Sequence, residues 1–137
     1  MLRRLNKIYD VPFKVDVAIL ILRVGISLLM LTHGYSKFEK ILHGDFSFGD
    51  PLGMGAGLSL ILTTFAEFFC SILVIFGLFT RPALIFLMFT MMVVVFIVKG
   101  GQGIAEMERG LLFLIPYISL FILGPGRLSM DAQFFRK

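Results

Sequence analysis

The chain has 137 residues, a net charge of +4 and a mean hydropathy of +0.93; 58% of its residues are hydrophobic and only 16% are charged. A soluble domain is usually about 45–50% apolar and about 25% charged, and a small domain cannot hide this much apolar surface in its core. The composition therefore excludes an ordinary soluble domain, and the scatter of basic residues at the ends of apolar stretches excludes a nucleic-acid-binding stripe.

Two apolar stretches fill the first half of the chain. Residues 17–32 are interrupted by Arg23, and residues 54–79 are interrupted by Glu67. A helix needs about 20 mostly apolar residues to span a bilayer, and a backbone inside lipid must satisfy its own hydrogen bonds, which a helix does. We predict spanning helices over residues 15–38 and 56–79, joined by an outer loop over residues 40–55.

Two further apolar stretches follow. Residues 83–98 carry no charge, whereas residues 110–123 are short and contain Pro116. The last stretch is long enough to span only if its helix begins near Ile104. We predict helices over 82–99 and 104–123, and hence an all-α membrane protein: one domain over residues 1–137, folded as a four-helix transmembrane bundle.

The Lys and Arg residues fall unevenly on the two sides of this bundle. Eight lie on the side of the two termini and four on the side of the loop at residues 40–55. Cytoplasmic segments carry the excess of Lys and Arg in membrane proteins. We therefore expect both termini in the cytoplasm.

Several ionisable residues lie at membrane depth. A charge near the bilayer centre costs at least ~2.5–3.5 kcal/mol, so such groups usually face the bundle interior and have partners. We expect Arg23 to reach toward Glu67 or the inner interface, and either to pin helices together or to leave Glu67 as a proton or ligand site. An outer polar cluster is predicted from His33, Lys37, Lys99 and Glu108.

The remaining unusual residues point to packing more than to metal chemistry. Met88 and Met92 share a face of the third helix, where thioethers suit either core packing or a flat apolar ligand. His33 and His43 lie at different depths and make a poor haem pair, so no metal or haem is expected. The single cysteine, Cys70, excludes an internal disulfide in this chain.

Motifs along the chain resemble those of a known family. They are, in order, Leu22-Arg23-Val24-Gly25, His33-Gly34 with Lys37, Glu67, Gly77-Leu78-Phe79-Thr80-Arg81-Pro82, Glu108-Arg109-Gly110 and Gly124-Pro125-Gly126-Arg127-Leu128-Ser129-Met130-Asp131. In this order and spacing the chain resembles the DoxX family of small four-helix bacterial membrane proteins.

The resemblance implies a setting and a set of residues. The family namesake is the membrane subunit of an archaeal thiosulfate:quinone oxidoreductase, which needs a second subunit, and other members associate with detoxifying redox enzymes. It implies a bacterial cytoplasmic (inner) membrane, a partner redox subunit and quinone as cofactor. The matching candidate residues are Arg23, His33, Lys37, Glu67, Arg81 and Glu108.

The favoured hypothesis is a subunit of a quinone-linked oxidoreductase. Glu67 and His33 are its predicted catalytic residues, because reduction of a quinone needs proton donors. Predicted quinone- or substrate-binding residues are Arg23, Lys37, Met88, Met92, Lys99 and Glu108, and predicted structural residues are Arg81, Arg127 and Asp131. The alternatives are a small-solute or proton-coupled transporter and a non-catalytic assembly subunit. Under each of these functions the protein can form a homo-oligomer.

Overall fold

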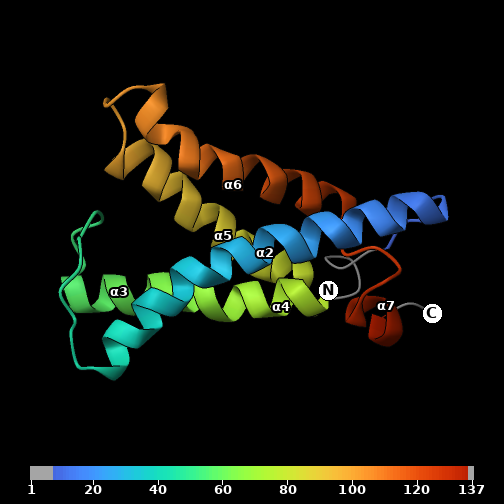
Figure 1. Ribbon diagram of the computed structural model, residues 1–137, viewed down its shortest axis with the longest axis horizontal. Coiled ribbons are helices and arrows are strands. Elements are labelled where there is room, and N and C mark those ends of the chain that lie inside the picture. Colours follow the sequence, from blue (N-terminus) through green and yellow to red (C-terminus); the bar gives the residue numbers. More distant parts are fainter. Residues whose placement is uncertain (1–7, 136–137) are drawn as a thin grey trace.

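The computed structural model describes residues 8–135, and within that range the chain is helical, with no strand. Figure 1 shows long helical rods, and residues 80–123 form a hairpin that leans away from the others at one end. The helices are α2 (Phe13–Leu42), α3 (Ala56–Thr64), η1 (Phe65–Cys70), α4 (Ser71–Phe76), α5 (Thr80–Met92), η2 (Val93–Val98), α6 (Ile104–Leu123) and α7 (Met130–Phe135). Segments η1 and η2 are π-helical turns, so α3, η1 and α4 form one continuous rod, and α5 and η2 form another.

Three of these rods are long and apolar enough to cross a membrane, counted over the residues that the structure describes. They are Phe13–Leu42, Ala56–Phe76 and Thr80–Val98. Less than half of each apolar window is buried inside the protein, so most of this apolar surface faces outward, where lipid covers it. The helix α6 is 20 residues long, but three charges in its first six residues, Glu106, Glu108 and Arg109, set it apart from the other rods.

The second rod ends three residues earlier than predicted. Gly77 follows Phe76 with a φ of +67°, a left-handed conformation that glycine adopts at helix ends without steric cost. Phe79 is also left-handed, with a φ of +48°. Together these residues turn the chain sharply into α5, which begins at Thr80 rather than residue 82.

The rods define two ends of the molecule. The tail end holds the start of α2, the turn between α4 and α5, the end of α6, and α7. The loop end holds the α2–α3 loop, residues 43–55, and the η2–α6 turn, residues 99–103. Helix α2 crosses the middle and contacts α3, η1, α4 and α6, while α5 and α6 pack along each other and diverge from α3 toward the loop end (Figure 1).

A close backbone approach fixes α2 against η1. A Cβ atom added at Gly34 would lie 2.6 Å from the carbonyl carbon and oxygen of Glu67 and from the nitrogen of Phe68. Only glycine allows this distance. The packing of α2 on η1 therefore depends on Gly34, and it fixes the position of Glu67 against α2.

Candidate functional site

Glu67 and Lys37 form an ion pair inside the protein. The Nζ atom of Lys37 donates to Oε2 of Glu67 at 2.6 Å, and the side chains are 22% and 5% exposed. Glu67 lies on the π-helical segment η1 and Lys37 lies on α2, one turn beyond Gly34. Because π-helical turns are rare and are often found at functional sites, we take this pair as the centre of a candidate site.

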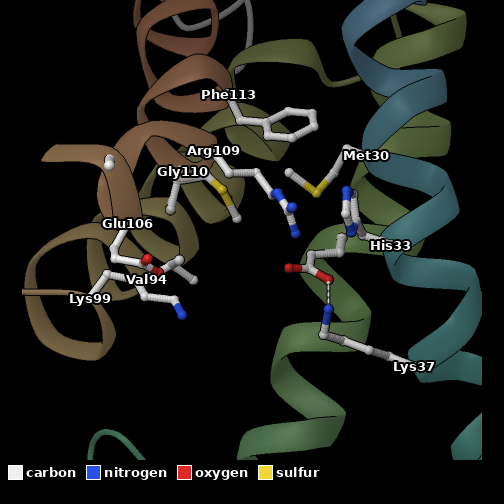
Figure 2. Close-up of a pocket in the computed structure, with 12 residues that line it drawn as sticks. Met30, His33, Lys37, Val94, Lys99, Glu106, Arg109, Gly110 and Phe113 are labelled. Atoms are coloured by element: carbon white, nitrogen blue, oxygen red, sulfur yellow. Dashed lines mark hydrogen bonds and ion pairs between the residues drawn. The ribbon is translucent and has the colours of Figure 1, made fainter. Parts of the chain in front are cut away.

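A polar pocket of about 460 Å³ opens beside the pair. Figure 2 shows its two walls: Met30, His33 and Lys37 come from α2, and the opposite wall comes from η2, the following turn and α6. The opposite wall carries the ionisable side chains Lys99, Glu106 and Arg109, with Phe113 further along α6. His33 packs edge-on against Phe113, with ring centroids 5.8 Å apart, and so connects the two walls.

The charges on the two walls differ in their partners. Lys37 and Glu67 neutralise each other. Among residues 8–135, by contrast, no ion pair within 4.0 Å engages Lys99, Glu106 or Arg109. The pocket thus offers two unpaired cations and one unpaired carboxylate to a small polar ligand.

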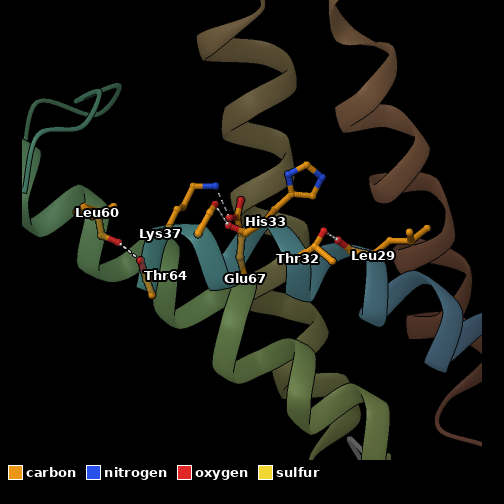
Figure 3. Close-up of polar contacts among 8 residues, drawn as sticks. Leu29, Thr32, His33, Lys37, Leu60, Thr64 and Glu67 are labelled. Atoms are coloured by element: carbon orange, nitrogen blue, oxygen red, sulfur yellow. Dashed lines mark hydrogen bonds and ion pairs between the residues drawn. The ribbon is translucent and has the colours of Figure 1, made fainter. Parts of the chain in front are cut away.

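Neighbouring hydroxyl groups leave the pair undisturbed. Thr64 donates to the carbonyl oxygen of Leu60 at 2.7 Å, and Thr32 donates to that of Leu29 at 2.6 Å (Figure 3). Each threonine therefore bonds to its own helix, so that neither hydroxyl competes with Lys37 for Glu67.

An apolar pocket of about 550 Å³ lies on the other side of the pair. Lys37, Glu67 and Val94 line this pocket as well as the polar pocket. Its remaining wall is mostly aromatic and aliphatic, and the α2–α3 loop supplies one side of it. The main contributors are Phe48, Pro51, Leu52, Met54, Leu62, Phe65, Phe86, Phe89, Val93 and Val98.

The structure brings together four of the predicted site residues and leaves others apart. His33, Lys37, Glu67 and Lys99 all line the polar pocket. Glu108 is exposed and lines neither pocket. Met88 packs against the hydrophobic core and Met92 is exposed, while Met30 and Met91 line the polar pocket.

The side chains that sequence reasoning missed come mainly from α6. Glu106, Arg109, Gly110 and Phe113 share a face of this helix and line the polar pocket. A spacing of three or four residues puts them on one side of a helix. The face that includes Glu108 carries Leu112, which is 62% exposed, so it points outward.

Arg23 lies at the tail end, away from the pair. Its side chain is buried, and its guanidinium donates to the carbonyl oxygens of Pro125 at 2.5 Å, Leu128 at 2.9 Å and Ile75 at 3.4 Å. Arg23 was predicted to reach either Glu67 or the inner interface. It reaches neither, and its guanidinium instead binds mainly backbone carbonyl groups of the C-terminal segment. The charge is solvated by carbonyl dipoles in place of water.

The predicted structural residues also gather at the tail end. The carboxylate of Asp131 accepts hydrogen bonds from the backbone nitrogens of Phe79 and Thr80 at 2.8 and 3.0 Å and so caps α5. Arg127 donates to the buried Asp16 at 2.6 Å. Arg81 donates to the carbonyl oxygen of Phe121 at 2.8 Å, near the end of α6.

Comparisons with known proteins agree with this architecture. A family model described as DoxX matches residues 18–100, a range that includes both members of the ion pair. A Haemophilus influenzae protein that is named only as uncharacterized is 31% identical over 127 residues, which cover 85% of this chain and 90% of that relative. No solved structure gives a significant match to the chain. The protein is thus a multi-pass membrane protein, and it belongs to the DoxX family.

Proposed function

We propose that this protein is the membrane subunit of a quinone-linked oxidoreductase and that the Lys37–Glu67 pair is its proton-handling site. One observation carries the proposal: the pair lines both a polar pocket and an apolar pocket. A ligand that enters from lipid and a ligand or proton that enters from water can therefore meet at the same two side chains.

In this proposal α6 is the fourth spanning helix. Its charged first turns, with Glu106, Glu108 and Arg109, lie at headgroup level, and the rest of the helix carries no charge. The termini lie in the cytoplasm and the loop end faces outward across a bacterial cytoplasmic membrane, as the excess of Lys and Arg on the terminal side favours.

The apolar pocket fits a quinone in size and chemistry. Pockets for small ligands are usually about 300–1,000 Å³, mostly apolar, with a few polar groups that set orientation. The walls here include Phe65, Phe86 and Phe89, and the ionisable groups are Lys37 and Glu67; the lining also includes the hydroxyl residues Ser59, Thr63 and Thr90. A flat ring with a hydrocarbon tail matches this arrangement.

A bound quinone supplies the capacity to accept two electrons and two protons. The chain's own part is to orient it and to deliver protons. The ammonium group of Lys37 can donate a hydrogen bond to a carbonyl oxygen, and it can transfer a proton that Glu67 helps to hold at that position. His33 stands in the polar pocket next to the pair and can return a proton from the aqueous side.

The electrons must come from a donor outside this chain's own side chains. Lys99 and Arg109 carry unpaired positive charge in the polar pocket, which favours an anionic donor. A partner redox subunit docked on this protein is the other source, as the family resemblance implies.

A proton-coupled transporter is the second candidate, since a buried acid–base pair between two pockets also suits coupling of a proton to a solute. The two functions separate on one variant. In a transporter, Glu67→Gln abolishes proton-dependent uptake by proteoliposomes, and the purified protein carries no quinone.

The test is quinone content and turnover after purification in mild detergent together with co-purifying proteins. We expect quinone to co-purify with the unmodified protein, and Glu67→Gln and His33→Ala to lower turnover about 10²-fold or more, the usual contribution of a positioned proton donor. Glu108→Gln is the matched control, because Glu108 is exposed outside both pockets. Full turnover in both site variants would refute the proposed role of these residues.

A further inference from the structure

The α2–α3 loop forms one wall of the apolar pocket. Five residues of the loop line it: Phe48, Gly49, Pro51, Leu52 and Met54. They face α3, η1, α5 and η2 across the pocket, and Leu52 and Met54 are themselves 42% and 38% exposed. The ionisable side chains of the pocket, Lys37 and Glu67, are on helices, whereas the loop contributes only apolar side chains and glycine.

A single carboxylate fastens this loop to the start of α3. Asp50 accepts hydrogen bonds from the backbone nitrogens of Met54 and Gly55, both at 2.9 Å, and from the hydroxyl of Ser59 at 3.0 Å. Ser59 is itself buried and lines the pocket. Asp50 therefore ties the middle of the loop to a rigid helix immediately beside the lining residues.

The neighbouring acid of the loop has a different role. Asp45 accepts from the backbone nitrogen of Ser47 at 3.0 Å and from its hydroxyl at 2.5 Å. These bonds stay within one short turn, and Asp45 also forms an ion pair at 4.0 Å with Lys40 in the last turn of α2; neither Asp45 nor Ser47 lines the pocket. The loop thus has two anchoring aspartates: Asp45 holds its start beside Lys40 of α2, and Asp50 holds its middle beside Ser59, which lines the pocket.

We propose that the loop is a roof over the hydrocarbon tail of the quinone-type ligand and that Asp50 is the positioning residue that keeps this roof closed. The inference rests on the proposed function. The ionisable pair lies at one end of the pocket, so the ring is expected there, and the tail is expected along the apolar loop wall. The roof then selects ligands with a flexible apolar tail and sets the rate at which they exchange with the bilayer.

The experiment compares two probes on the full-length protein in nanodiscs: decylubiquinone, which carries a ten-carbon tail, and the tail-less ubiquinone-0. Asp50→Ala should speed release of decylubiquinone about tenfold, since a charge-assisted hydrogen bond contributes a factor of this order. Release of ubiquinone-0 should not change, because this probe does not reach the roof. Asp45→Ala is the matched control and should leave both rates unchanged.

Two more variants keep the test decisive if Asp50→Ala does not fold. Ser59→Ala removes one of the three bonds to Asp50 and should speed decylubiquinone release by a smaller factor. Leu52→Ala removes apolar contact and should weaken binding of decylubiquinone more than that of ubiquinone-0. The roof is refuted if decylubiquinone binds all variants with unchanged rates, whereas failure of both probes to bind the unmodified protein refutes the quinone function itself.

Discussion

The two ends of this molecule use charged residues in opposite ways. At the tail end Arg23, Asp131 and the Asp16–Arg127 pair are held by backbone groups or by each other. At the loop end Lys99, Glu106 and Arg109 line a pocket, and within the described part of the chain no ion pair engages them.

This difference separates stability from function in a small membrane protein. Buried charges whose hydrogen bonds are made within the fold stabilise one arrangement of the helices. Charges that line a pocket without partners remain available to a ligand. The Lys37–Glu67 pair lies between these cases, because it is partnered but stands at the wall of two pockets.

The largest expected loss in the free energy of unfolding is at Arg23, at the tail end. Arg23→Ala leaves the carbonyl oxygens of Pro125 and Leu128 without their donor in a buried site, which should cost about 3 kcal/mol or more in the free energy of unfolding. The matched control is Arg109→Ala, an exposed arginine at the loop end, with an expected change of about 0.5 kcal/mol or less. Reversible unfolding in mixed detergent micelles measures both, and equal losses would contradict the division between the two ends.

A second, somewhat smaller effect is expected at the contact between α2 and η1. Gly34→Ala places a methyl group against the Glu67 backbone, and such overpacking usually costs about 1–3 kcal/mol. Because the same shift moves Lys37 from Glu67, quinone binding should fall as well. Gly25→Ala, on the same helix with nothing within 4 Å of the added Cβ, should fold and bind as the unmodified protein does, and a defect equal to that of Gly34→Ala would refute the close approach.

A double-mutant cycle measures how strongly Lys37 and Glu67 are coupled. Lys37→Met leaves the Glu67 carboxylate without its partner, and we expect a loss of about 1–2 kcal/mol, less than for a fully buried pair because Lys37 is 22% exposed. Lys37→Met combined with Glu67→Gln should recover part of this loss, whereas quinone turnover should stay low in all three variants. If the free energies of unfolding lost in Lys37→Met and Glu67→Gln simply add in the double variant, the two side chains are not coupled.

The smallest effect concerns pH at the loop. Hydrogen bonds from the backbone of Gly55, and from Ser59 and Met54, hold the pKa of Asp50 below its ordinary value. A depressed folded pKa stabilises the loop at every pH above the unfolded value of about 3.9, and this contribution is lost as pH falls through the lower folded value. Decylubiquinone release should therefore be constant from about pH 7 to 5 and should quicken only below about pH 4; a rise already near pH 6 would assign the effect to another group.

The helices could be predicted from sequence, because long apolar stretches and glycine or proline at their ends leave few other options in lipid. The partners of the charged residues could not. Arg23 needed some buried acceptor, but its carbonyl partners at Pro125 and Leu128 lie about a hundred positions along the chain, and no local pattern specifies such contacts.

The face of α6 that lines the pocket could not be predicted either. Glu108 was assigned to the outer polar cluster, yet a charge in the first turns of a membrane helix can reach water without facing the interior. The pocket-lining residues Glu106 and Arg109 lie on a neighbouring face. The π-helical turn at Glu67 has no local sequence signature either, so the register that brings Glu67 to Lys37 emerges only from packing.

The most direct test of the central claim is equilibrium binding of decylubiquinone to the protein in nanodiscs after the apolar pocket is filled. Thr90 lines this pocket, and Met92, two residues away on the same helix, is exposed and does not line it. We predict that Thr90→Trp abolishes binding and that Met92→Trp preserves it. Equal binding by both variants would contradict a ligand site beside Lys37 and Glu67.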